Sequence, residues 1–424
     1  MREIHPLGAP PDASISIPGS KSLTNRALLL GALARGRSRL TDVLFSDDTC
    51  VMVECLRRLG FAVQVDQPEL LMTVEGRGGE IPAESADLFV GGAGTAARFL
   101  TAMVGLGSGR YTIDGTERMR ERPIQDLLDA LGMLGVEAVA ERGTPPVVVN
   151  ARGLRGGRAV VRGDTSSQFL SALLMVAPYA QDDVEVVLEG RLVEAPYVEM
   201  TLAVMEAFGI RVEREGLRRF FFRSGGCYRA RDYAIEPDAS AAAYFFAAAA
   251  VTGGRVRVPG LSASSLQGDA RFVDLLEEMG CRVVRGEDFL EVSGSGVLRG
   301  IEADLSEMSD QTMTLAAIAP FADGPTRIRD VAHIRHHESD RVAATATELR
   351  RLGQEVEERD DGLVIMPRPL RPAVVQTYDD HRIAMAFAVT GLRAPGIAIA
   401  NPGCVAKTFP DFFERLEDLR PVPV

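Results

Sequence analysis

Residues 18–30 read PGSKSLTNRALLL, and this stretch contains the signal that recurs through the chain and decides its fold. The alternating Ile15 and Ile17 predict a short strand that stops at Pro18-Gly19, after which an apolar run predicts a helix. Two serines, a lysine and an arginine lie at this junction. Free backbone N–H groups and the positive end of a helix dipole bind anions at such a position. The same residues are also ordinary helix caps, so that an anion site and simple capping both stay open.

A unit of about 70 residues with a similar opening recurs six times along the chain. Each copy begins with a small, apolar helix, continues into a β-rich segment and then forms a second, more amphipathic helix. The first helices are expected to begin near residues 25, 95, 167, 241, 311 and 381. Five of the second helices end in an apolar residue and a glycine, which is typical of a helix C-terminus: Gly60, Gly135, Gly209, Gly280 and Gly353. The unit therefore reads β-α-β-α-β-β, with buried Ala-rich helices and charged helices outside.

Six such units predict an α/β protein of two pseudo-symmetric domains with three units each. Because the N-terminal strand precedes the first helix, we assign it to the C-terminal half of the chain. Domain I then comprises residues 1–18 and 236–424, and domain II comprises residues 19–235. A solenoid of six units is the alternative arrangement.

The bulk composition is that of a globular protein, with 424 residues, 46% hydrophobic and 25% charged. No apolar run is long enough to cross a membrane, and the N-terminus carries no apolar leader. The five cysteines show no metal-binding spacing, so we expect a cytoplasmic protein with reduced thiols. A net charge of −12 argues against nucleic-acid binding, and an anionic ligand would need a local group of cations.

Lysine is nearly absent from the chain. Of the 47 Lys and Arg residues, only Lys21 and Lys407 are lysine. Arginine has replaced lysine wherever a solvated positive charge suffices. We therefore expect these two positions to require a compact ammonium group that can give up a proton, which a guanidinium does not do.

The residues at the six helix starts differ from the rest of the chain. Glycines, hydroxyls and an amide occupy the first three, at residues 19–22, 91–95 and 164–168, whereas carboxylates dominate the last three, at 236–238, 309–311 and 378–382. Basic residues lie at the same end of the units, at 118–122, 335–341, 382 and 407. A charge-rich loop is usually only a solvated turn, but the recurrence at one end of every unit favours a shared anion pocket.

These motifs resemble the 5-enolpyruvylshikimate-3-phosphate synthases, a branch of the enolpyruvyl transferases, from about Ile15 to Phe413. The residues that carry the resemblance are PGSKS at 18–22, GTAAR at 94–98, RPI at 122–124, SSQF at 166–169, PY at 196–197, ESDR at 338–341, DHR at 380–382 and AKTFP at 406–410. The resemblance implies two domains of three β-α-β-α-β-β units, an arrangement called an inside-out α/β barrel. It places the active site in the cleft between the domains, which close on the ligands.

The resemblance also implies the reaction, in which the enolpyruvyl group of phosphoenolpyruvate moves to the 5-hydroxyl of shikimate 3-phosphate with release of phosphate. This is the penultimate step toward chorismate and the aromatic amino acids. The reaction needs no metal and no redox cofactor. The implied partners are the two small-molecule substrates, without nucleic acid or membrane, and the expected form is a monomer. The family is the target of the herbicide glyphosate, which occupies the phosphoenolpyruvate site.

Site residues follow from the resemblance position by position. Those expected to bind shikimate 3-phosphate are Lys21, Ser22, Arg26, Ser166, Ser167, Gln168, Tyr197, Asp310 and His337. Those expected to bind phosphoenolpyruvate are Lys21, Gly94, Arg122, Gln168, Arg341, Arg382 and Lys407. Asp310, Glu338 and Lys21 would carry the catalytic proton transfers.

Four positions depart from the best-known members of that family. Gly92 stands where they have Asn and Phe99 where they have Pro, and both bear on glyphosate sensitivity, although Gly94 is retained. Glu194 replaces a phosphate-contacting Ser, so either its side chain turns away or the phosphate is held differently. His337 replaces a Lys, and with an ordinary pKa near 6.5 it is charged only part of the time unless the phosphate raises its pKa.

Two other functions compete with this interpretation. The sister enzyme that acts on UDP-N-acetylglucosamine typically has Lys-Asn in the first motif and a cysteine in its mobile loop. Here the first motif contains Lys21-Ser22, and the loop at 118–122 has no cysteine. A non-catalytic repeat protein that only binds an anion would explain the helix starts, but not Asp310 and Glu338 beside the basic residues.

Overall fold

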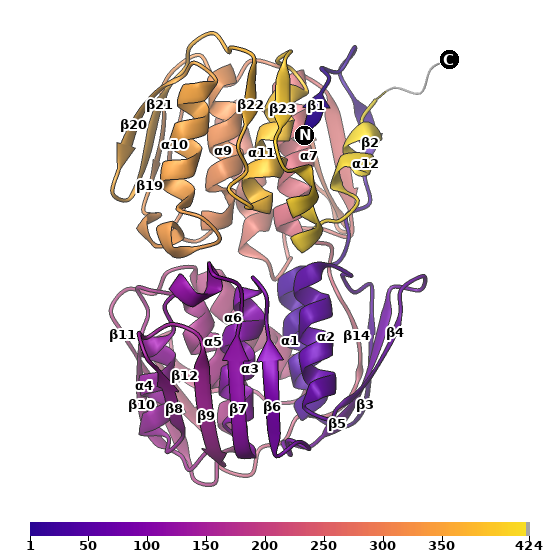
Figure 1. Ribbon diagram of the computed structural model, residues 1–424. Coiled ribbons are helices and arrows are strands. Elements are labelled where there is room, and N and C mark those ends of the chain that lie inside the picture. The colour runs from indigo at the N-terminus through magenta and orange to yellow at the C-terminus, as the bar shows by residue number, and fades with distance from the viewer. Residues whose placement is uncertain (421–424) are drawn as a thin grey trace. The chain divides into compact units, whose positions relative to one another are not determined.

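The computed structural model describes residues 1–420, and the chain forms two compact units. We call Gly19–Ile235 the N-unit, and Met1–Pro18 together with Glu236–Val424 the C-unit. Figure 1 labels most of the helices and strands of both. Each unit contains three copies of one arrangement, in which a buried helix, an outer helix and a small mixed sheet follow one another.

Three buried helices form the centre of the N-unit: α1 (Lys21–Leu33), α3 (Gly94–Val104) and α5 (Ser167–Val176). Every residue of α3, and every residue of α1 from Leu23 onward, is buried. A helix that is apolar on all sides must be covered on all sides, which explains its place inside the sheets. Ser166 caps α5 by accepting a hydrogen bond from the backbone N–H of Gln168 at 3.2 Å. A 3-10 turn, η2 (Ala177–Tyr179), extends α5.

The outer helices of the N-unit are α2 (Asp47–Arg58), α4 (Gln125–Met133) and α6 (Ala195–Ala207), and a 3-10 turn, η1 (Met119–Glu121), precedes α4. The glycines that follow them have the left-handed backbone that the sequence pattern requires, with φ of 89° at Gly60, 88° at Gly135 and 93° at Gly209. The next strand or extended segment can therefore start directly after each helix.

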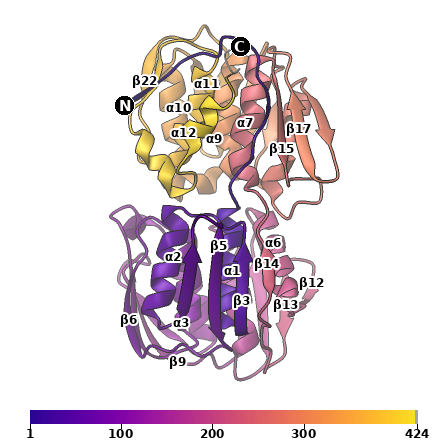
Figure 2. The same cartoon turned by 90° about the vertical axis from the view of Figure 1, so that its right-hand side faces the viewer.

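Three four-stranded sheets cover the N-unit helices, and all three share one strand order: a parallel pair followed by two antiparallel strands (Figures 1 and 2). The first is β14 (Asp232–Ala234), β3 (Arg35–Thr41), β5 (Leu71–Arg77) and β4 (Ala62–Asp66). The second is β6 (Ser85–Phe89), β7 (Ser108–Asp114), β9 (Val147–Arg152) and β8 (Glu137–Ala140). The third is β10 (Gly157–Arg162), β11 (Val184–Glu189), β13 (Arg219–Phe222) and β12 (Glu213–Glu215).

The C-unit repeats this plan. Its buried helices are α7 (Ala239–Thr252), α9 (Thr312–Ile318) and α11 (His381–Gly391), and its outer helices are α8 (Phe272–Glu278), α10 (Arg341–Arg351) and α12 (Phe412–Glu417). Short 3-10 turns lead into or out of several of them: η3 (Gly268–Arg271), η4 (Ser309–Gln311), η5 (Ala319–Phe321), η6 (Ala332–His336) and η7 (Pro402–Lys407).

The first strands of the chain complete two sheets of the C-unit. The first sheet is β2 (Asp12–Ser14), β15 (Arg255–Pro259), β17 (Phe289–Ser293) and β16 (Arg282–Arg285). The second is β18 (Glu302–Asp304), β19 (Thr326–Arg329), β21 (Gly362–Met366) and β20 (Glu355–Arg359). The third has three strands, β22 (Ala373–Val375), β23 (Ile397–Ile399) and β1 (Arg2–Ile4), and β1 takes the antiparallel place next to β23.

The predicted α/β fold class with buried helices and outer sheets is confirmed. Within residues 1–420 the sheets are separate and open, so they form no closed barrel, although the arrangement is called an inside-out α/β barrel. The solenoid alternative is wrong, because β1 and β2 pair with strands near residues 397 and 255, whereas solenoid repeats contact only their neighbours. None of the helices in this part of the chain has the length and apolar character needed to span a bilayer.

Candidate active site

The predicted site residues lie at the beginnings of helices. Lys21, Gly94 and Ser167 are the first residues of α1, α3 and α5. In the C-unit, Asp310 lies in η4 just before α9, and Arg382 is the second residue of α11. The first turn of a helix has backbone N–H groups without helical partners, so each of these positions favours negative charge.

Arg26 in α1 organises one group of predicted residues in the N-unit. Its Nε donates to Thr201 Oγ1 at 2.8 Å, and its terminal nitrogens donate to the carbonyl oxygens of Ser22 and Tyr197, both at 3.1 Å. The guanidinium also lies 5.1 Å from the centre of the Phe99 ring. Burial lowers the pKa of Arg26 to about 10, although Tyr197 and Glu194 act to raise it. Three predicted residues, Ser22, Arg26 and Tyr197, are therefore brought together around one buried cation.

Glu194, one of the departures noted in the sequence, lies close to this group. Its side chain is buried and accepts a hydrogen bond from Ser167 Oγ at 3.2 Å, so it does not turn away into solvent. Gln168, next to Ser167, has a buried side-chain amide oxygen that accepts no hydrogen bond from residues 1–420. Unsatisfied buried acceptors are uncommon in proteins and often mark a place where a ligand donates.

Lys21 is paired with a carboxylate that the sequence analysis did not single out. Its ammonium lies 3.4 Å from Asp48 Oδ2, and both side chains are largely buried, with 14% and 4% of their surfaces exposed. Asp48 belongs to the first turn of α2, where an acidic residue is expected for the helix dipole alone. The helix dipole is enough to explain Asp48 in the sequence, so no local pattern indicates its ion pair with Lys21.

Gly94 and Arg122 are in close contact. A Cβ placed on Gly94 would lie 2.8 Å from both terminal nitrogens of Arg122, which is closer than real Cβ atoms approach. Nearby, Arg98 donates to the carbonyl oxygens of Gly94 and Pro123, at 3.3 and 2.9 Å, and so ties the start of α3 to the loop that carries Arg122. A side chain at this position would therefore force the Arg122 guanidinium to move.

Arg341 is the centre of the ionic cluster in the C-unit. Its Nε lies 2.8 Å from Asp380 Oδ2, its Nη1 lies 2.8 Å from Asp310 Oδ1, and its Nη2 lies 2.9 Å from Glu338 Oε2. Only 2% of its side chain is exposed. Burial alone would lower the pKa of Arg341, but Asp380, Glu338 and Asp310 outweigh it and raise the pKa above its ordinary value. The two carboxylates predicted to move protons thus share one arginine.

Arg382 and Lys407 extend this cluster. Arg382 Nη2 lies 2.5 Å from Asp310 Oδ2, and its Nη1 lies 3.4 Å from the Tyr244 hydroxyl. Burial raises the pKa of Tyr244 to about 12, with Arg382 acting in the opposite direction, so the phenol stays neutral. Lys407 Nζ lies 3.9 Å from Glu338 Oε1. Asp310 and Glu338 therefore each face two cations.

His337 lies against Arg341, with its Nδ1 3.2 Å from Arg341 Nη1. A guanidinium has donors only, so Nδ1 must be the acceptor and carries no proton in this arrangement. A charged His337 would have to give up this contact.

Asp269 is a buried carboxyl that the sequence analysis missed. It lies in η3, and its Oδ2 accepts from Ser240 Oγ and, at 3.2 Å, from Gln311 Nε2. Burial chiefly, and then the neighbouring Asp310, raise the pKa of Asp269 to about 7. Gln311 is the next residue after Asp310, so Asp269 holds the turn that carries the predicted base.

Capping, the simpler interpretation of the helix starts, also holds at several of them. Asp238 accepts from the Ala241 N–H at 2.9 Å at the start of α7, and Asp380 accepts from the Arg382 N–H at 3.0 Å at the start of α11. Asp380 does more than cap, because it also binds Arg341.

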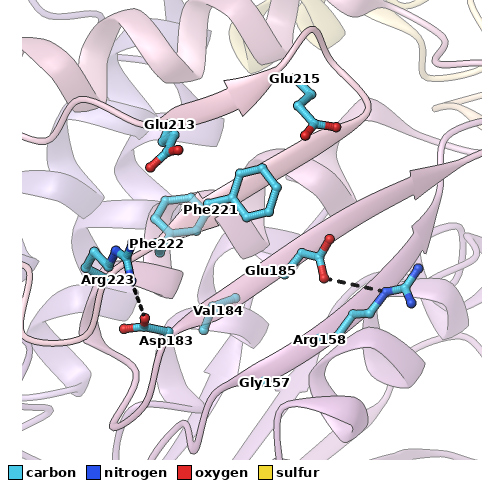
Figure 3. A pocket seen from close by; sticks show the side chains of 10 residues that line it. All are labelled: Gly157, Arg158, Asp183, Val184, Glu185, Glu213, Glu215, Phe221, Phe222 and Arg223. Carbon is cyan, nitrogen blue, oxygen red and sulfur yellow. Dashed lines mark hydrogen bonds and ion pairs between the residues drawn. The ribbon is translucent and has the colours of Figure 1, made fainter.

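A surface hollow of ≈ 420 Å³ lies elsewhere in the N-unit, over β10, β11, β12 and β13 (Figure 3). Carboxylates outnumber cations in its lining, and its cations are paired: Arg223 lies 3.0 Å from Asp183, and Arg158 lies 3.8 Å from Glu185. None of the predicted site residues lines it. An acidic surface of this kind does not suit an anionic substrate.

Within residues 1–420 no group of three or more His, Cys, Asp or Glu side chains is arranged to hold a metal ion. The cations described above instead include a C-unit cluster in which Arg341, Arg382 and Lys407 face the carboxylates of Asp310 and Glu338. Such an arrangement can bind small dianions and transfer protons.

Comparison with known proteins agrees with this chemistry. The family model for EPSP synthase (3-phosphoshikimate 1-carboxyvinyltransferase) matches residues 8–416. A 3-phosphoshikimate 1-carboxyvinyltransferase of Trichormus variabilis is 52% identical over 411 residues, covering 96% of both chains. The chloroplastic enzyme of that name from Solanum lycopersicum is 48% identical. The match covers 95% of this chain and 82% of that enzyme.

Solved structures show the same fold. EPSP synthase from Acinetobacter baumannii superposes with a TM-score of 0.81 at 25% identity, covering 99% of this chain and 98% of that one. The enolpyruvyl transferase NikO from Streptomyces tendae has a TM-score of 0.75 at 22% identity, covering 98% and 96%. With a family model matched over nearly its whole length and relatives about half identical to it, the chain belongs to the EPSP synthase (3-phosphoshikimate 1-carboxyvinyltransferase) family.

Proposed function

We propose that this enzyme joins phosphoenolpyruvate to the 5-hydroxyl of shikimate 3-phosphate, giving 5-enolpyruvylshikimate 3-phosphate and inorganic phosphate. The relatives that are 45–52% identical to the chain carry the name of this transferase. The structural observation that supports the proposal best is the ionic cluster of the C-unit. Two carboxylates there share the buried Arg341, and each has a further cation beside it.

The reaction proceeds in two steps. In the first, the 5-hydroxyl oxygen bonds to C2 of the enol while its proton is removed and a proton is added to C3, which gives a tetrahedral ketal phosphate. In the second, the bond from C2 to the phosphate oxygen breaks, a proton leaves C3 and the double bond returns. The chemistry therefore needs a base, an acid and cations on the leaving phosphate.

Asp310 and Glu338 are suited to the two proton transfers. We propose that Asp310 holds the ring hydroxyls of shikimate 3-phosphate and exchanges the proton of the 5-hydroxyl, and that Glu338 is the second proton-transfer group, acting with Lys21. Each carboxylate is only 15% exposed and already faces cations, which would steady the negative charge as protons move.

The remaining predicted residues divide between the substrates. Shikimate 3-phosphate would be bound by Lys21, Ser22, Arg26, Ser166, Ser167, Gln168, Tyr197, Asp310 and His337. Phosphoenolpyruvate would be bound by Lys21, Gly94, Arg122, Gln168, Arg341, Arg382 and Lys407. The first group lies mainly in the N-unit, and the second draws on both units. We therefore propose that catalysis requires the two units together, each as one domain, and that the enzyme works as a cytoplasmic monomer.

His337 tests the phosphate assignment. If a charged His337 holds the 3-phosphate, the affinity for shikimate 3-phosphate should weaken as the pH rises through the pKa of His337 in the complex. A His337→Lys variant would keep its charge and lose this pH dependence. An unchanged pH profile in the variant would remove His337 from the phosphate site.

Phosphate release measured with two substrate pairs distinguishes the three candidate functions. Release from phosphoenolpyruvate with shikimate 3-phosphate is the expected result. Release only with UDP-N-acetylglucosamine would identify the sister transferase instead, and release with neither would leave an anion-binding protein without this activity.

A further inference from the structure

Glu194 has an unusual position, directly before α6. It is the N-cap residue of that helix, and its backbone is left-handed, with φ of 52° and ψ of 42°. Residues other than glycine, asparagine and aspartate rarely adopt this conformation. Its side chain is nevertheless buried, with 5% of the residue exposed. A strained backbone that carries a buried carboxylate indicates that the carboxylate is held there by specific partners.

The first partner is Ser167, whose hydroxyl donates to Glu194 Oε2 at 3.2 Å. A serine hydroxyl has only one hydrogen to donate. Ser167 is the first residue of α5, a helix of ten residues, and is one of the serines proposed to bind shikimate 3-phosphate. A phosphate bound by this hydroxyl must therefore take the hydrogen bond that Glu194 now accepts.

The second partner is the charge of Arg26. Its three hydrogen bonds all go to uncharged oxygens, on Thr201, Ser22 and Tyr197. Burial lowers the pKa of Arg26, whereas Tyr197 and, to a smaller extent, Glu194 act to raise it. Burying a cation costs free energy, and a nearby negative charge reduces that cost. Glu194 supplies such a charge from within the chain.

We propose that Glu194 is an internal anion that stands, in the free enzyme, where the 3-phosphate of the substrate binds, taking the Ser167 hydrogen bond and offsetting the charge of Arg26. The 3-phosphate of the substrate must displace this carboxylate or bind beside it. Glu194 therefore weakens the discrimination of this enzyme between shikimate 3-phosphate and unphosphorylated shikimate. The inference rests on the proposed function, because that function assigns Ser167 and Arg26 to shikimate 3-phosphate.

Two substitutions remove the charge in different ways. Glu194→Gln keeps the size of the side chain and an oxygen that can accept from Ser167. Glu194→Asn has a shorter side chain, but asparagine suits both an N-cap and a left-handed backbone. This variant can therefore be measured even if Glu194→Gln misfolds. The matched control is Glu199→Gln, an exposed glutamate on the same helix that pairs with Arg214.

Isothermal titration measures the Kd of each variant for shikimate 3-phosphate and for shikimate. We expect both Glu194 variants to bind shikimate 3-phosphate about tenfold more tightly than the parent enzyme or better, because like charges in close contact oppose binding. The Kd for shikimate should stay within about twofold, and the Glu199 control should bind both ligands as the parent does. The free Glu194 variants should also melt at a lower temperature, with a larger upward shift on adding shikimate 3-phosphate.

Unchanged or weaker binding of shikimate 3-phosphate in both variants would overturn the proposal. Equal tightening for the two ligands would overturn it as well, because the effect would not act on the phosphate. Phosphate release by the parent enzyme is assayed in parallel. If the parent turns over shikimate 3-phosphate but the variants do not bind it more tightly, this inference fails alone, whereas absence of turnover in the parent refutes the proposed function.

Discussion

The Arg341→Lys substitution tests whether the shape of Arg341, beyond its charge, holds the C-unit cluster together. Arg341 contacts three carboxylates, Asp310, Glu338 and Asp380, which come from three separate segments. A planar guanidinium with five N–H donors can reach all three at 2.8–2.9 Å, whereas lysine presents a single nitrogen on a flexible stem. The variant keeps the positive charge and loses the directional contacts.

The size of the effect follows from these contacts. An ammonium at this position can remain close to one of the three carboxylates, so about two charge-assisted hydrogen bonds are lost. Hydrogen bonds to charged groups contribute about 1.5–3 kcal/mol each, which predicts a loss of about 3–6 kcal/mol in the free energy of unfolding. Only 2% of the Arg341 side chain is exposed, so solvent screening does not reduce this figure. Breaking other buried ion pairs has effects of about 3–5 kcal/mol.

Urea unfolding followed by circular dichroism gives the stability, and phosphate release gives the KM for phosphoenolpyruvate. Arg350→Lys is the control on the same helix, because its side chain is 46% exposed and its ion pair with Glu358 is long, at 3.6 Å. The control should change stability by less than about 1 kcal/mol. If Arg341→Lys loses no more stability than the control and keeps its KM for phosphoenolpyruvate, the importance assigned to the arginine fork is wrong.

Three further predictions concern single positions. Gly94→Ala puts a methyl group 2.8 Å from the Arg122 nitrogens, so the KM for phosphoenolpyruvate should rise about tenfold or more in steady-state assays, and an unchanged KM would show that Arg122 moves freely. Burial raises the pKa of Asp269 to about 7, so the stability that this carboxyl contributes is complete at low pH and falls as the pH rises from about 4 toward 7. An Asp269→Asn variant does not lose this stability, so its urea midpoint should rise relative to that of the parent over the same pH range. A difference that does not change with pH would contradict the raised pKa. Lys21→Arg and Lys407→Arg should each lower kcat about 100-fold or more with the fold intact by circular dichroism, because a guanidinium does not release a proton; retention of most activity would show that these lysines act only as charges.

Much of the fold was predictable because it repeats. The Ala-rich helices and the glycines at 60, 135 and 209 depend on local periodicity and backbone conformation, which a single sequence displays directly. The place of β1 beside β23 is not local, since the pairing joins residues nearly 400 positions apart. The sequence assigned the strand before the first helix to the C-terminal half of the chain, but it did not indicate which strand would pair with it.

The site was predictable in its cations and less so in their partners. Asp48 and Asp269 escaped notice because an acidic residue in a first helical turn needs no further explanation from the sequence. Both are identified only when the chain brings them against Lys21 or beside the turn of Asp310. The sequence also left open the direction of the Glu194 side chain, because its contact with Ser167 joins residues 27 positions apart.

The scarcity of lysine makes the two ammonium groups spectroscopically accessible. Reductive methylation with ¹³C-formaldehyde keeps the charge of lysine and places a label on each amine, so Lys21, Lys407 and the terminal amine would account for all of the resonances. Lys21 beside Asp48 and Lys407 beside Glu338 have different surroundings, and their signals should be separate. Titrating each substrate into the labelled enzyme would then show which ammonium senses which ligand, without any substitution in the chain.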